Sequence, residues 1–213
     1  MQKEVWTELK AEEFLEKYLP VAKHTLCKKQ VEVEKAAKQF GFPVVLKISA
    51  KDLVHKSDIG GVQIAKNKEE LCDKYNLLIS AAKKHKLKLN GIIAQEFIEG
   101  HQAIVGIKKD ATFGHCVMLG SGGIYVELLK DVAFRVCPIN EQDAEEMINE
   151  IKTKKIWEGY RGGIKINFNE LKKTLVKISQ IPIKNKKIDE LDINPLILNS
   201  KVCKVVDARI SWG

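Results

Sequence analysis

Acidic and amide side chains near the C-terminus alternate with apolar residues in a pattern that could hold a metal ion. The stretch ELDINPL places Glu190, Asp192 and Asn194 at every second position, and Asp207 follows in VVDARI. Alternate residues of a strand share one face, and a short turn between two antiparallel strands would bring Asn194 close to Asp207. A few oxygen ligands without His or Cys suit Mg²⁺ that is shared with substrate phosphates. The polar face of an edge hairpin explains the pattern equally well.

A second candidate site lies in VVLKISAKDLVHKSDIGGVQIA, residues 44–65. Lys47, near the end of an apolar strand, could bind phosphate as a cation, although such lysines usually extend their ammonium group to solvent. His55 lies among lysines and could act as a base or as a phosphoryl-accepting nucleophile, although a lone histidine is usually structural. Gly60 and Gly61 would allow backbone amides to approach an anion.

Two further signals are weaker. GSGG, residues 120–123, follows an apolar run, but both GxxxxGK[ST] and GxGxxG are absent, so a tight turn is the simpler interpretation. Glu127 lies inside the apolar segment IYVELL, where an acid is costly unless it is paired. The three arginines, Arg135, Arg161 and Arg209, stand among 33 lysines, which suggests sites that need a planar, bidentate donor.

The elements that position these residues follow from periodicity and breakers. We expect an α+β chain with a small lobe over residues 1–90 and a larger, strand-rich lobe over residues 91–213, separated near the turn signal Asn90-Gly91. The predicted helices cover residues 8–18, 30–40, 68–86, 140–155 and 169–178. The predicted strands cover residues 44–48, 61–65, 91–98, 103–110, 115–123, 133–139, and two C-terminal segments joined at Asn199-Ser200.

Composition excludes several classes of protein. The 213 residues carry a net charge of +8, but the lysines fall on amphipathic patterns and turns without aromatic stacking residues, so we predict no nucleic-acid partner. Five scattered cysteines indicate reduced core thiols rather than a disulfide framework or a metal site. No apolar run is long enough to span a bilayer, and the N-terminus lacks a signal-peptide core. We therefore predict a cytoplasmic protein that does not bind membranes.

Taken together and in order, four blocks resemble the ATP-grasp subunit of ADP-forming acyl-CoA (acetyl-CoA) synthetases. They are FGFPVVLKISAKDLVHKSDIGGV, IIAQEFIEGHQAIVGIKKDATFG, VMLGSGGIYVELLKDVAFRVCPI, and ELDINPL with VVDAR. The resemblance implies an ATP-grasp fold of two lobes around a nucleotide. It also implies the reaction acyl-CoA + ADP + phosphate ⇌ carboxylic acid + CoA + ATP, with Mg²⁺ and ATP/ADP as cofactors. Acyl and CoA chemistry would belong to a CoA-binding α subunit in a heteromer such as α2β2, and this chain would be the β subunit.

The resemblance also assigns roles to residues. Those assigned to the nucleotide are Lys47 at the phosphates, Gly60 and Gly61 in a covering flap, Gln95, Glu96 and Ile98 around the adenine, and Gln102 at the ribose, where the family commonly has glutamate. His55 would carry the phosphoryl group between the α subunit and ADP, and Asp192 would steady the phosphohistidine. Asn194 and Asp207 match the Mg²⁺ ligands.

Two other functions stay open at the level of sequence. An ATP-grasp subunit could sense nucleotide or regulate a partner without turnover, and Gln102 is the feature that favours this reading. A basic nucleic-acid-binding protein rests on charge alone, and a salt titration of DNA binding would test it.

Overall fold

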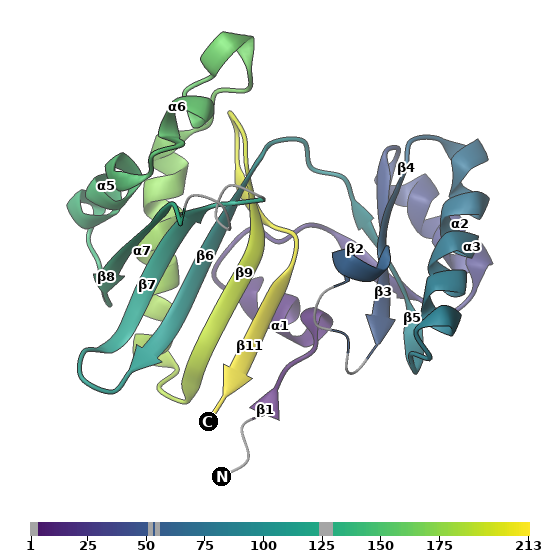
Figure 1. The fold of residues 1–213 in the computed structure, drawn as a ribbon, viewed down its shortest axis with the longest axis horizontal. Coiled ribbons are helices and arrows are strands. Elements are labelled where there is room, and N and C mark those ends of the chain that lie inside the picture. Colours follow the sequence, from purple (N-terminus) through teal and green to yellow (C-terminus); the bar gives the residue numbers. More distant parts are fainter. Residues whose placement is uncertain (1–3, 51–52, 54–55, 124–129) are drawn as a thin grey trace. The chain divides into compact units, whose positions relative to one another are not determined.

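The structure is a computed structural model that describes residues 4–50, 53, 56–123 and 130–213. Its contacts divide the chain into two units, each of which is described by itself (Figure 1). The large unit comprises Met1–Val21 and Glu99–Gly213, and the small unit comprises Ala22–Ile98. The sequence had placed the boundary near residue 90 and all of the N-terminus in the small lobe. The contacts instead place the boundary after Ile98 and assign the first 21 residues to the large unit.

The small unit is a four-stranded antiparallel sheet with the order β2-β5-β3-β4, packed against two helices. Its elements are β2 (His24–Cys27), α2 (Gln30–Phe40), β3 (Val44–Ala50), η1 (Ser57–Ile59), β4 (Val62–Ala65), α3 (Lys68–Lys84) and β5 (Leu89–Glu96). Asn67 caps α3 by accepting a hydrogen bond from the Glu70 N–H, and Gly41 ends α2 with a left-handed φ of 84°. The apolar faces of both helices pack on β3 and β5 and form a separate core.

The large unit is built on an antiparallel sheet with the order β1-β11-β9-β6-β7-β8, and β10 pairs with β9. Its strands are β1 (Glu4–Val5), β6 (His101–Asp110), β7 (Gly114–Ser121), β8 (Val132–Val136), β9 (Ile188–Leu198), β10 (Cys203–Val205) and β11 (Ala208–Trp212). Its helices are α1 (Glu8–Leu15), α5 (Glu141–Glu150), α6 (Lys154–Trp157), η2 (Tyr160–Gly162) and α7 (Phe168–Lys184).

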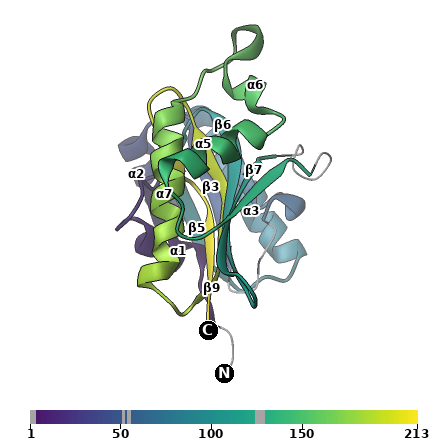
Figure 2. The ribbon, with the colours of Figure 1, turned by 90° about the vertical axis from the view of Figure 1, so that its left-hand side faces the viewer.

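One face of the large sheet carries the core of this unit. Figures 1 and 2 show α5 and α7 covering that face, and residues of α1 join the same hydrophobic cluster. Along β6, the buried Ala103, Val105 and Ile107 point into this core at every second position. The residues between them therefore line the opposite face, where the polar residues of β9 also lie.

The predicted α+β class is confirmed, and most elements lie where the patterns placed them. The pattern missed the short strands β1 and β2, and the helix predicted over residues 140–155 ends at Glu150 as α5, with α6 as a separate short helix. Helix α7 continues to Lys184, beyond the predicted end at residue 178 and through Pro182. The last predicted strand is divided into β10 and β11. Short edge elements carry too few residues for a periodic pattern, which explains the omissions.

The cysteines only partly match the predicted core thiols. Cys27 and Cys203 are buried, Cys116 and Cys137 are half-buried, and Cys72 is exposed on α3. Burial raises the pKa of both Cys137 and Cys203 to about 12, so these two thiols are unreactive at neutral pH. No described helix combines the length and the apolar character needed to cross a membrane.

Candidate functional site

Lys47 is a buried lysine in the middle of a strand. It lies within β3, paired in register with Val62 on β4 and Ile93 on β5, and only 4% of the residue is exposed. The sequence had placed it near the strand's end, where an ammonium group could reach open solvent. A buried ammonium group needs compensating polar contacts. Lys47 is therefore not a solvated surface lysine, and its burial is compatible with the predicted binding of phosphate.

The glycine pair after η1 closes a tight turn. The Gly60 N–H donates to the Ser57 carbonyl at 3.1 Å, and the Gly61 N–H donates to the Lys56 carbonyl at 2.7 Å. Gly60 has a left-handed φ of 69°, and a Cβ on Gly61 would lie 2.7 Å from the Lys56 carbonyl oxygen. Both positions therefore require glycine. For either amide to bind phosphate, these turn bonds would have to be exchanged. His55, Lys51 and Glu127 lie outside the described residues.

The predicted adenine-binding segment lies at the end of β5. Gln95 is 1% exposed, and Ile98 is half-buried just beyond the strand. Glu96 is tied to Lys23 in both directions: its Oε1 accepts the Lys23 N–H at 2.7 Å, and its own N–H donates to the Lys23 carbonyl at 2.9 Å. This pair of bonds holds the end of β5 against the entry to β2.

Gln102 and the glycine run approach each other closely in the large unit. Gln102 is exposed on β6, and its carbonyl accepts the Gly122 N–H at 3.0 Å. A Cβ on Gly122 would lie 2.6 Å from the backbone carbonyl carbon of Gln102, and a Cβ on Gly123 would lie 3.8 Å from its Oε1. The glycines of GSGG thus let the end of β7 contact the residue that the resemblance assigns to the ribose.

Asp192 lies on the face of the large sheet opposite the helices. It is half-buried on β9, in register with Arg209 on β11 and Gly106 on β6. Burial raises the pKa of the Asp192 carboxyl, the charges of Glu190 and Asp207 raise it further, and Arg209 acts in the opposite direction. A carboxyl group whose pKa is raised by its surroundings is typical of functional sites, although structural networks also produce such shifts.

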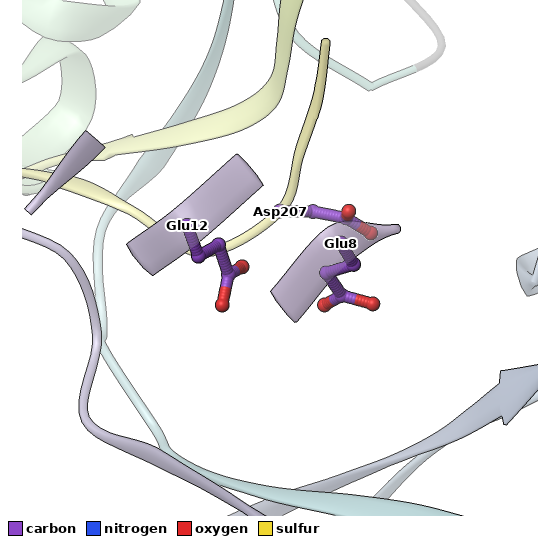
Figure 3. Close-up of side chains that lie close together, drawn as sticks. All are labelled: Glu8, Glu12 and Asp207. Atoms are coloured by element: carbon purple, nitrogen blue, oxygen red, sulfur yellow. The ribbon is translucent and has the colours of Figure 1, made fainter. Parts of the chain in front are cut away.

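Asn194 and Asp207 come together as the hairpin pattern predicted, since the Asn194 N–H donates to the Asp207 carbonyl at 3.1 Å. Figure 3 shows Asp207 beside two acids of helix α1, Glu8 and Glu12. One carboxylate oxygen from each of these three residues lies within 4.8 Å of the others, and Glu12 is fully buried. Hard oxygen donors gathered in this way suit a divalent cation such as Mg²⁺.

No pattern in the sequence indicated Glu8 or Glu12 as site residues. Their spacing of four residues places both on one face of α1, but only the packing of α1 against the large sheet places that face beside Asp207. One feature of the sequence could have indicated a site: Glu12 is an acid beside Ala11 and Leu15, which form the apolar, buried face of α1.

Arg135 has a structural role in this unit. Its Nη2 lies 2.5 Å from Glu150 Oε1 and 3.4 Å from Glu146 Oε2, both on α5. The side chain therefore joins β8 to the helix layer.

Two pockets, of about 370 and 420 Å³, are lined by residues of the same unit such as Lys165 and Phe168. None of the predicted site residues lines either pocket.

Comparison with known proteins gives the family. The ATP-grasp domain family matches residues 1–211. The 4-hydroxybutyrate–CoA ligase (ADP-forming) of Nitrosopumilus maritimus is 40% identical over 210 residues, which are 95% of this chain and 30% of that protein. The subunit beta of acetate–CoA ligase (ADP-forming) I of Pyrococcus furiosus is 39% identical over 208 residues, which are 95% of this chain and 90% of that subunit.

Solved structures agree with these matches. Acetyl-coenzyme A synthetase 1 of Candidatus Korarchaeum cryptofilum, in complex with coenzyme A, Ca-AMPCP and HgCl⁺, is 40% identical with a TM-score of 0.92, covering 98% of this chain and 93% of that chain. A second structure of that protein contains coenzyme A and Mg-AMPPCP, and is 37% identical with a TM-score of 0.83 over the same shares of the two chains. The expected ATP-grasp fold is thus confirmed, and the chain belongs to the ATP-grasp domain family.

Proposed function

We propose that this chain is the nucleotide-binding β subunit of an ADP-forming acyl-CoA ligase. The proposed reaction is acyl-CoA + ADP + phosphate ⇌ carboxylic acid + CoA + ATP. The observation that carries the proposal is the 39% identity to the β subunit of the Pyrococcus ligase, over 95% of this chain and 90% of that subunit. The chain spans 30% of the Nitrosopumilus ligase. The CoA-binding half of the reaction would be supplied by an α subunit in the cytoplasm.

The resemblance to the family supports the following nucleotide contacts. Lys47 would neutralise phosphate charge, Gln95, Glu96 and Ile98 would surround the adenine, and Gln102 would bond the ribose. Gly60 and Gly61 would belong to a flap over the phosphates. Phosphoryl transfer requires mainly positioning and charge neutralisation, which a buried lysine and backbone amides can supply.

Asn194 and Asp207 would hold Mg²⁺, with Glu8 and Glu12 alongside. The donor set fits this ion because it consists of carboxylate and amide oxygens, and three of the carboxylates cluster within 4.8 Å. When bound, the ion would neutralise the charge of the phosphate oxygens. Asp207 also adds to the raised pKa of Asp192, so a cation there would lower the pKa of that carboxyl.

His55 would transfer the phosphoryl group. One of its ring nitrogens would attack the phosphorus of a phosphohistidine on the α subunit, so that one P–N bond forms as the other breaks. A terminal phosphate oxygen of ADP would then attack the same phosphorus, forming ATP and releasing the neutral imidazole of His55. Asp192 would hold the phosphorylated ring in position by accepting its N–H.

A turnover assay tests the proposal. The chain is combined with the CoA-binding subunit encoded in the same genome, and ATP formation from acetyl-CoA, ADP and phosphate is measured. His55→Ala should lower kcat by at least roughly 1,000-fold because covalent transfer is removed. The matched control is His85→Ala, at the exposed C-terminus of α3, which should keep wild-type activity.

The outcomes separate the alternatives. Full activity of His55→Ala would remove the phosphoryl-carrier role but leave the subunit assignment. Calorimetry with Mg·ADP distinguishes a nucleotide sensor from an enzyme. Tight nucleotide binding without turnover, beside an α subunit that is competent with another β subunit, would contradict the catalytic function.

A further inference from the structure

Residues 152–165 form a projecting segment of the large unit, named here the 152–165 arm. It contains α6 and η2, and Figures 1 and 2 both show it extending beyond the end of the sheet. An isolated β-bridge between Glu158 and Lys165 closes its base. None of the residues assigned to nucleotide, metal or phosphoryl transfer belongs to the arm, so the proposed chemistry gives it no role.

The arm is firmly attached to the large unit. The carboxylate of Asp131, which is 1% exposed, accepts hydrogen bonds from the N–H groups of Lys152 and Thr153 at 2.7 and 2.9 Å. The Thr153 hydroxyl adds a third bond of 2.7 Å. Burial by itself would raise the pKa of Asp131, but these hydrogen bonds hold it below its usual value, so the carboxylate is charged at neutral pH.

Further contacts fix the other side of the arm. Trp157 is 2% exposed, and its carbonyl accepts the Ile166 N–H at 2.9 Å. A ring nitrogen of His101, Nε2, lies 2.7 Å from the Ile164 carbonyl oxygen. His101 begins β6 and precedes Gln102. The arm is therefore anchored by hydrogen bonds at both of its ends, and one of them joins it to a strand assigned to the nucleotide.

The tip of the arm holds an exposed tyrosine and an arginine in a disfavoured backbone conformation. Arg161 has φ 53° and ψ 35°, in the left-handed region that side chains rarely adopt, between Gly159 at φ 88° and Gly162 at φ 80°. Tyr160 is 62% exposed, and Arg161 Cζ lies 5.4 Å from the centre of its ring. Strained backbone of this kind is concentrated at binding and catalytic sites in proteins.

The arm is also strongly basic. It contains four lysines and Arg161 against one acid, Glu158, so its net charge is +4. Glu158 pairs with Lys154 at 3.3 Å. Across residues 4–50, 53, 56–123 and 130–213, no carboxylate lies within ion-pairing distance of Arg161, Lys155 or Lys165. The arm therefore presents positive charges at Lys155, Arg161 and Lys165 that no carboxylate of the described residues pairs with.

We propose that the 152–165 arm docks onto an acidic, carboxylate-bearing surface of the CoA-binding partner subunit, with Tyr160 and Arg161 as its central contacts. The proposal rests on the proposed heteromeric function, in which a second chain supplies the CoA-binding half. Tyrosine and arginine, together with tryptophan, are enriched among energetically dominant interface contacts. A guanidinium group that is held in place loses little conformational freedom when it binds a carboxylate bidentately.

Arg161→Gly is the sharpest test because it removes the side chain and relieves the backbone at the same time. Calorimetry measures the dissociation constant between the full chain and the CoA-binding subunit of the turnover assay. Arg161→Gly and Tyr160→Ala should each raise this constant roughly 30-fold. The unfolding midpoint of free Arg161→Gly should equal or exceed that of the wild type, because glycine adopts φ 53° without strain. Its Mg·ADP affinity should stay within about twofold of the wild type, because the arm makes no assigned nucleotide contact.

Lys186→Ala is the matched control. It also removes one exposed positive charge from the large unit, but it lies beyond the far end of α7, whose 17 residues span about 25 Å. It should leave the dissociation constant unchanged. Raising NaCl from 50 to 300 mM should weaken the wild-type complex much more than the Arg161→Gly complex, because exposed charges are screened by salt.

Each alternative outcome overturns the docking proposal in a recognisable way. Unchanged partner affinity in both arm variants, or a lowered unfolding midpoint without an affinity change, shows a structural role only. Self-association that is lost in Arg161→Gly assigns the arm to a second copy of this chain, and arm-dependent binding of duplex DNA assigns it to nucleic acid. A wild-type chain that does not bind the subunit overturns both docking and heteromeric assembly. Arm-dependent binding without turnover overturns only the proposed function.

Discussion

Asp192, which is proposed to take part in phosphoryl transfer, also lowers the stability of the folded protein at neutral pH. Its carboxyl is half-buried and close to Glu190 and Asp207, and these surroundings raise its pKa against the opposing effect of Arg209. The folded chain therefore binds a proton at Asp192 more tightly than the unfolded chain does. Stability from this residue is fully present below its unfolded pKa of about 3.9 and is lost as the pH rises through the folded value.

Asp192→Asn should therefore stabilise the protein at pH 7 while lowering turnover. We expect the free energy of unfolding to rise by on the order of 1 kcal/mol at pH 7 and to be unchanged below pH ~3.5. Turnover should fall roughly 100-fold or more if the carboxylate steadies the phosphorylated histidine. Denaturant titrations at several pH values and the ATP-forming assay measure the two effects. The exposed Asp73→Asn should change neither, and a destabilised Asp192→Asn at pH 7 would contradict the prediction.

Gly122, just after β7, packs closely against Gln102 on β6, and this contact decides whether a side chain fits at position 122. Gly122 lies against the backbone of Gln102, where a Cβ would be 2.6 Å from the carbonyl carbon. Gly106 lies in the same strand as Gln102, but a Cβ there would meet Met118 Cε at 3.5 Å, an ordinary contact distance. Two glycines on neighbouring parts of the sheet thus differ in whether the packing requires them.

Gly122→Ala should destabilise the large unit, and Gly106→Ala should not. The added methyl group at Gly122 meets the backbone of Gln102, which cannot rotate away, so we expect a loss of about 1–3 kcal/mol. At position 106 alanine restricts the unfolded chain, so stability should stay unchanged or rise by about 0.4–1 kcal/mol. Urea unfolding of both variants measures the difference. Equal stability of Gly122→Ala and the wild type would show that β7 does not approach Gln102 this closely.

At the scale of the molecule, each unit has a core of its own, and the two ends of the chain complete the large one. Strand β1 pairs with β11, and the rings of Trp6 and Trp212 stack with their centres 4.9 Å apart and Phe14 at their edges. The small unit has a separate hydrophobic cluster built from α2, α3 and its own sheet. Local stability can therefore change in one unit without changing in the other.

Trp212→Ala should weaken the large unit selectively. Removing a half-buried tryptophan that stacks on a second indole should cost about 3 kcal/mol. Native-state hydrogen exchange should become faster at the amides of β9 and β11, while the amides of β3 and β5 change by less than about twofold. Equal acceleration in both units would show that the whole chain unfolds as one cooperative structure and would contradict the prediction.

How far the sequence could predict the fold and the site depends on whether the deciding contacts are local. The stop at Gly41, the cap at Asn67 and the alternation along β9 use near neighbours, so the pattern identified α2, α3 and the polar face of β9. The proximity of Asn194 to Asp207 needed only one hairpin. Glu8 and Glu12 are separated from Asp207 by almost the whole chain, and no local pattern could place them together.

By itself, the sequence determined the α+β class and most of the helices and strands, because periodicity and turn residues act over a few positions. The ATP-grasp family was indicated separately, by the resemblance of four sequence blocks. Only the tertiary structure decided that the first 21 residues belong with the C-terminal unit, that α1 adds two carboxylates beside Asp207, and that Lys47 is buried in the middle of its strand. The physical reason is that burial and the grouping of like charges depend on which surfaces pack together. The apolar period of a segment indicates which of its faces is buried, but not which distant segment packs against that face.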